Sequence, residues 1–184
     1  MNVPASPKTT PAVGYLAISH DPQHGFLGGL LIVSPQGRPL EFHCSTPVLP
    51  TRAQEILYGP TLRPYVSGEL IAGALLAAVK IRPRVLLVQD LCGQPPAAGC
   101  PVGVIPEGYG VQPDEPANEQ SPLAAKAPPI ILSGGPEADL PEAEGLLAEL
   151  SERINLAEPF ERVHEAIREA QRIGAQEVTV DDAA

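Results

Sequence analysis

The first half of the chain alternates short apolar runs with turn sequences, a pattern typical of consecutive β-strands. Three such runs span 13–19, 26–33 and 40–45. Pro35 and Gly37 lie between the second and third runs, where proline fixes the dihedral of a turn and glycine fits its exit. The pattern predicts a three-stranded antiparallel meander.

Two of these runs differ in how their apolar residues are placed. The run 26–33 is apolar throughout, so we expect a central strand that is covered on both faces. In the third run, Leu40, Phe42 and Cys44 alternate with polar residues. We expect these three side chains to face the core.

Helical patterns follow the meander. Thr51 and Gln54 have the spacing of a capping box, in which each side chain bonds to a backbone N–H group at the start of a helix. After a Gly-Pro break, apolar residues recur every four positions and predict a longer helix over about 62–79. Residues 84–89 are rich in valine and leucine, which predicts a strand parallel to a neighbour.

Proline and glycine dominate the segment 92–141, which holds 11 prolines and seven glycines. We expect an irregular linker or lid there, since loops of this length are uncommon inside a compact domain. Beyond it, apolar residues at spacings of three and four predict a pair of amphipathic helices. Their apolar faces either dock on the chain's own sheet or bind a partner, as a helix binds in a groove. The expected partner-binding residues are Leu146, Leu150, Ile154, Phe160, Val163 and Ile167.

We therefore predict an α/β (α+β) fold, in which an antiparallel meander, helices and a parallel strand precede a C-terminal helical hairpin. The expected parts are a flexible N-terminal extension over 1–12, an α/β core domain over 13–91, the linker or lid over 92–141, and an acidic helical hairpin and tail over 142–184. A length of 184 residues fits one domain with an appended tail.

Charge is divided unevenly along the chain, whose formal net charge is -10. Residues 1–106 carry seven Lys or Arg and five Asp or Glu, whereas 107–184 carry five and seventeen. No clustered basic face is evident, which disfavours nucleic acid as a partner. The longest apolar run, 70–79, is about half the length that a bilayer-spanning helix needs. Because the N-terminus also lacks the apolar region of a secretory signal, we expect no membrane contact and a cytoplasmic location.

Two groups of residues carry candidate chemistry. His20, Asp21 and His24 in the first turn are potential metal ligands, although a His-x-x-x-His pair binds from one face only on a helix. Cys92 and Cys100 stand further apart than the cysteines of a zinc knuckle. They form a weak candidate for a redox pair.

The order of three antiparallel strands, helices and a parallel strand resembles the first part of the ribonuclease-H-like fold, over roughly 13–90. Enzymes of that class, among them endonucleases that act on damaged bases, hold divalent metal with carboxylates from the first strand, a helix start and the end of the fourth strand. The resemblance implies Glu69 and Asp90 for the last two positions. The run 13–19 has no carboxylate and Asp21 follows only in the turn, so the set is incomplete.

These observations predict a non-catalytic cytoplasmic module for protein–protein interaction or assembly, with a protein partner or self-association and no cofactor. The alternative is a divalent-metal-dependent hydrolase or nuclease of ribonuclease-H-like fold. Its incomplete carboxylate site would be Asp21, Glu69 and Asp90, with a divalent metal as the cofactor.

Overall fold

The three N-terminal apolar runs form an antiparallel meander. The computed structural model describes residues 11–89, 97–106 and 130–178. Strand β1 (Val13–Asp21) pairs with β2 (Gly25–Val33), which pairs with β3 (Pro39–Cys44). Both faces of β2 are buried, as its continuous apolar sequence predicts. The fold class is confirmed as α/β.

The turn between β2 and β3 forms at the predicted proline and glycine, Pro35 and Gly37. The backbone N–H of Gly37 donates to the carbonyl of Ser34 at 2.8 Å, and Gly37 has a φ of 72°, a conformation that glycine adopts at no steric cost. The turn therefore reverses the chain where the sequence predicts a reversal.

A helical crossover leads from the meander to the parallel strand β4 (Val85–Gln89). Both halves of the predicted capping box are formed between Thr51 and Gln54. The helix expected over about 62–79 forms as an unbroken series of helical turns after the predicted Gly-Pro break, and its hydrogen-bond pattern is π-helical over Tyr65–Ala72. The successive segments are α1 (Arg52–Tyr58), the 3-10 turn η1 (Gly59–Thr61), α2 (Leu62–Pro64), the π-helical η2 (Tyr65–Ala72) and α3 (Gly73–Ala78).

Two short strands extend the sheet within the segment that we expected to be irregular. Strand β5 (Val102–Val104) lies parallel to β4, and β6 (Leu132–Ser133) lies antiparallel to β5. Strands of three and two residues leave no detectable period in a proline-rich sequence, which explains why sequence analysis missed them. The sheet order is β3-β2-β1-β4-β5-β6.

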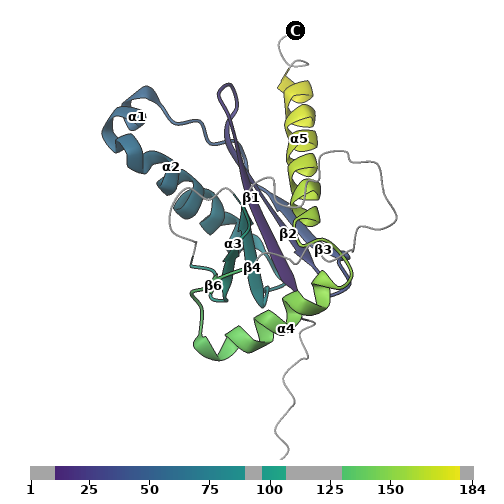
Figure 1. Ribbon diagram of the computed structural model, residues 1–184. Coiled ribbons are helices and arrows are strands. Elements are labelled where there is room, and N and C mark those ends of the chain that lie inside the picture. Colours follow the sequence, from purple (N-terminus) through teal and green to yellow (C-terminus); the bar gives the residue numbers. More distant parts are fainter. Residues whose placement is uncertain (1–10, 90–96, 107–129, 179–184) are drawn as a thin grey trace, which may run out of the picture.

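The helices form layers on both faces of this sheet (Figure 1). The crossover helices pack on one face through residues such as Ile71 and Leu75. After the 3-10 turn η3 (Glu137–Asp139), α4 (Leu140–Ser151) and α5 (Glu158–Val178) pack on the other. No helix among the described residues is long and apolar enough to span a membrane.

The expected partner-binding surface lies inside this second layer. Leu146, Leu150, Phe160, Val163 and Ile167 are all buried in one core cluster with the sheet, and Ile154 packs against that cluster. Docking on the chain's own sheet removes these side chains from water, so none of them offers a free apolar face to a partner. The prediction that they bind a partner is corrected accordingly.

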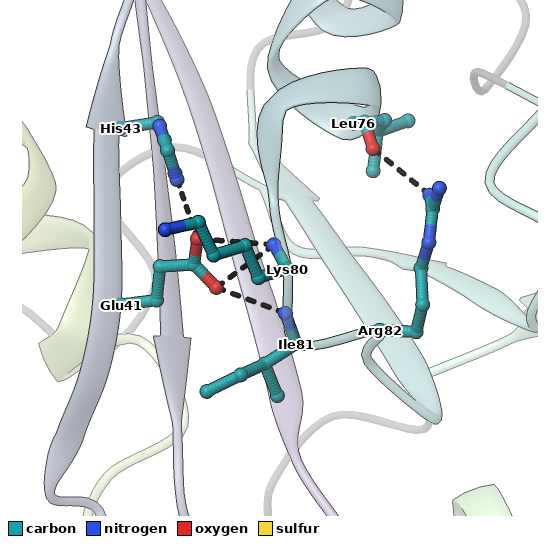
Figure 2. A network of polar contacts seen from close by, with 6 residues as sticks. All are labelled: Glu41, His43, Leu76, Lys80, Ile81 and Arg82. Carbon is teal, nitrogen blue, oxygen red and sulfur yellow. Dashed lines mark hydrogen bonds and ion pairs between the residues drawn. The ribbon is translucent and has the colours of Figure 1, made fainter.

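The facing of β3 also differs from the prediction. Leu40 and Phe42 are 41% and 39% exposed, whereas Glu41 and His43 lie on the face covered by the crossover. Glu41 accepts hydrogen bonds from the backbone N–H groups of Lys80 and Ile81 and from His43 (Figure 2). Cys44, on the same face as Leu40 and Phe42, does pack against the core on the side of α4 and α5. Leu40 and Phe42 stay partly exposed on this face of the edge strand.

Candidate functional site

The carboxyl ends of β1 and β4 form the position where a ligand is expected in this topology. The two strands are parallel neighbours, with Ala17 in register with Gln89. From β1 the chain turns to β2 on one side, and from β4 it continues toward β5 on the other side. In open α/β sheets, ligands bind outside the carboxyl ends of strands at such a reversal. We call this edge, from residues 19–21 to Gln89, the switch edge.

A polar pair lies at the switch edge on the side of α5. Gln89, the last residue of β4, is only 6% exposed, and its Oε1 lies 3.0 Å from Nε2 of His164 on α5. A carboxamide oxygen only accepts, so the imidazole Nε2–H is the donor. Helix α5 comes close here because β2 has a glycine beneath it: a Cβ at Gly29 would lie 2.7 Å from Cγ1 of Val163. We did not expect this pair from the sequence.

The hairpin between β1 and β2 uses the carboxylate that we considered as a metal ligand. Asp21 Oδ1 accepts from the backbone N–H of Gln23 at 2.8 Å, from that of His24 at 2.9 Å and from His24 Nδ1 at 2.8 Å. The two backbone bonds, and then the bond from the His24 side chain, lower the pKa of Asp21. The ring of His20 instead packs on Phe26, with centroids 4.3 Å apart. His20, Asp21 and His24 therefore stabilise a turn and do not converge on a cation.

The other expected carboxylates do not complete a metal site among the described residues. Glu69 lies exposed on η2, and Asp90 lies outside the described residues. Along β1, residues 13–18 are buried and carry no carboxylate. No group of three or more His, Cys, Asp or Glu in the described ranges is placed to hold a metal ion. The described residues alone do not complete the carboxylate set that the ribonuclease-H-like resemblance implies.

The cysteines offer no reactive thiolate in the part of the chain that is described. Cys100 is buried, and burial is the main reason that its pKa is raised to about 11. Burial also raises the pKa of Cys44. Thiols with raised pKa values are poor nucleophiles at neutral pH. Cys92 lies outside the described residues, so its pairing with Cys100 stays a prediction.

A helical arm projects from the same end of the molecule as the hairpin tip (Figure 1). We define this crossover arm as residues 49–65, which include α1, η1 and α2. None of the residues of α1 is buried. Leu49, Ile56 and Leu57 are 63%, 67% and 82% exposed, so the arm presents large apolar side chains to solvent.

Two tyrosines stack on each other along the crossover arm. The rings of Tyr58 and Tyr65 are 5.0 Å apart between centroids with an interplanar angle of 25°. Tyr58 is 39% exposed, and its proximity is the main cause of the raised pKa of Tyr65. Arg52, which pairs with Glu55 at 2.8 Å, and Arg63 add cationic groups to the arm. The apolar residues of the arm are visible in the sequence, but their exposure depends on how the arm leaves the sheet.

Solved structures match this chain at low similarity, among them two complexes. Both are endonuclease V of Ciona intestinalis in complex with DNA containing an inosine followed by a ribo-adenosine. One, a variant, is 16% identical, covers 52% of this chain and 45% of its own, and has a TM-score of 0.32. The other is 14% identical, covers 59% and 50%, and has a TM-score of 0.31. This chain thus spans about half the length of each. No protein-family model and no curated protein matches it.

These matches correct one expectation. We expected a protein partner or self-association and disfavoured nucleic acid, whereas both matched structures hold DNA. Our expectation relied on the overall charge of the chain. Aromatic side chains also contribute to the binding of nucleic acid, because bases stack on them.

Proposed function

We propose that this protein binds nucleic acid through its crossover arm, with unpaired bases stacking on the Tyr58–Tyr65 pair. The observation that carries the proposal is an arm with no buried residue in α1 and a stacked, partly exposed tyrosine pair. Every nucleobase has a flat π-face, so aromatic side chains bind single strands with little regard to sequence.

The distribution of charge supports the same site. The acidic residues that make the chain negative lie mainly in 107–184, whereas the arm carries Arg52 and Arg63 against Glu55. Because the arm has only these two cationic side chains, it can contact few phosphates, and most of the affinity must come from stacking. We therefore expect a shallow salt dependence, with a log–log slope no steeper than about -1.4 for two phosphate contacts.

Our alternative expectation, a divalent-metal-dependent hydrolase or nuclease, would also cleave the bound strand. We limit the proposal to binding, in which no described residue needs a metal or another cofactor. We also propose a cytoplasmic location for this activity. Incubation of the complex with Mg²⁺ or Mn²⁺ and a search for shortened strands tests the hydrolase or nuclease alternative directly.

Fluorescence anisotropy with labelled single-stranded DNA of about 12 nucleotides tests the proposal. We expect Tyr58→Ala and Tyr65→Ala each to weaken binding by about tenfold, since stacking is worth about 1–3 kcal/mol per base. Phe42→Ala is the matched control, because Phe42 is also 39% exposed but lies on β3. Absence of binding by the intact chain, or equal weakening by Phe42→Ala, would overturn the proposal.

A further inference from the structure

We infer that the Gln89–His164 pair reads the edge of one base at the switch edge and prefers a base with two adjacent acceptors. This inference rests on the proposed function and adds base preference to it. The arm supplies stacking, which does not distinguish bases, and the polar pair supplies hydrogen bonds, which do.

The position of Gln89 is unusual for its strand. Val85 and Leu87 share its face of β4 and are fully buried with the other apolar residues of the α5 layer. An apolar side chain at position 89 would continue this packing at no polar cost, whereas a carboxamide that is 6% exposed requires hydrogen-bond partners. The Gln89 carboxamide thus lies at the carboxyl end of β4, where a ligand is expected in this topology.

The bond to His164 determines which half of the carboxamide is available to a ligand. Oε1 of Gln89 receives the Nε2–H of His164 at 3.0 Å. The groups that the side chain offers to a ligand are therefore the two N–H donors of its amide. A glutamine held in this way acts as a donor pair and no longer as the mixed donor and acceptor of a free carboxamide.

The preference for one base over another follows from the hydrogen-bonding groups on the edge of each base. Guanine presents two acceptors, O6 and N7, on one edge, whereas adenine presents the acceptor N7 beside the donor N6. A free glutamine fits adenine because it offers one donor and one acceptor. With its oxygen occupied by His164, Gln89 fits guanine better. The inferred ligand is a single strand with an unpaired guanine at the switch edge.

Anisotropy with the full chain and three thymidine strands of about 12 nucleotides tests this inference. One strand carries a single central dG, one a dA, and one a 7-deaza-dG that lacks the N7 acceptor. We expect the dG strand to bind about tenfold more tightly than the other two, the discrimination that a good paired contact gives. Gln89→Leu should remove this difference, whereas His164→Phe, which leaves Oε1 of Gln89 without its donor, should shift the preference from dG to dA.

The outcomes separate this inference from the proposal on which it rests. Equal binding of the three strands by the intact chain overturns the base preference and leaves binding through the arm standing. Failure to bind any strand overturns both. If the pair only held α5 to the sheet, His164→Phe would lower the melting temperature and keep the preference for dG, which also overturns the inference. Because Gln89→Leu alters a buried position, His164→Phe provides the test on a half-buried one.

Discussion

Glu41 and Ile81 are 40 residues apart in sequence, and the carboxylate of the first accepts the backbone N–H of the second at 2.9 Å. The same carboxylate accepts the N–H of Lys80 at 3.0 Å and contacts Nε2 of His43 at 2.6 Å. Arg82 donates nearby to the carbonyl of Leu76 at 2.9 Å (Figure 2). One side chain thus ties the edge strand β3 to the segment that leads from α3 to β4.

Replacing Glu41 should destabilise the fold. We expect Glu41→Ala to lower the melting temperature by several degrees, because two backbone N–H groups lose a charged acceptor. Glu55→Ala is the control, since Glu55 pairs only with the exposed Arg52 across one turn of α1. Thermal unfolding by circular dichroism measures both variants. Equal melting temperatures for the two would show that the Glu41 bonds add nothing to stability.

The same carboxylate should make stability depend on pH in the acid range. The hydrogen bond with His43, followed by those from Ile81 and Lys80, lowers the pKa of Glu41 from 4.5 to about 2. Its stabilisation is therefore complete above about pH 4.5 and is lost as the pH falls toward about 2. Urea unfolding over this range should show a smaller loss of stability for Glu41→Gln than for the wild type. Parallel curves would contradict the assignment.

Two glycines, one on β2 facing the crossover helices and one within them, should respond to alanine in opposite directions. A Cβ at Gly28 would lie 2.3 Å from Cγ2 of Ile71, so Gly28→Ala should cost about 1–3 kcal/mol of unfolding free energy. At Gly73, a helical position, a Cβ would meet nothing within 4 Å, and Gly73→Ala should add about 0.5–1 kcal/mol. Denaturant titration measures both values. A stabilising Gly28→Ala would mean that β2 and η2 are further apart than described.

The packing of α5 on the sheet can be tested at Phe160. This side chain is 1% exposed and meets the ring of Tyr15 edge to face, with centroids 5.1 Å apart. Phe160→Ala should cost about 3–5 kcal/mol of unfolding free energy, as large truncations in a core do. Leu57→Ala on the arm, where the side chain is 82% exposed, should stay within about 0.5 kcal/mol of the wild type. A small effect at Phe160 would indicate that α5 separates from the sheet.

Local chemistry made much of the fold predictable. The turn at Gly37 and the capping box at Thr51 depend on residues within a few positions of each other, and both form as expected. The apolar run of β2 likewise indicated a strand covered on both sides. The long crossover helix also forms where the four-residue period of its apolar residues predicts it, but the π-helical pattern over Tyr65–Ala72 was not predicted.

The candidate site depends on contacts that no local pattern contains. Gln89 and His164 are 75 residues apart and meet only because α5 folds back across the sheet. The cluster of His20, Asp21 and His24 had the residue types of a metal site, yet its bonds close within the turn. Spacing along the chain therefore grouped residues whose bonds stay within one turn, and strand order was needed to find the position of the switch edge.

In the crossover arm, the residues of α1 that a ligand can reach are not residues on which folding depends. Since α1 contributes nothing to the interior, its side chains can be exchanged with little effect on whether the chain folds. Selection for a ligand can thus act on the arm alone, while the sheet and its helices hold the arm at a fixed place. Substitutions in α1 should therefore leave the packing of the sheet and its helices intact.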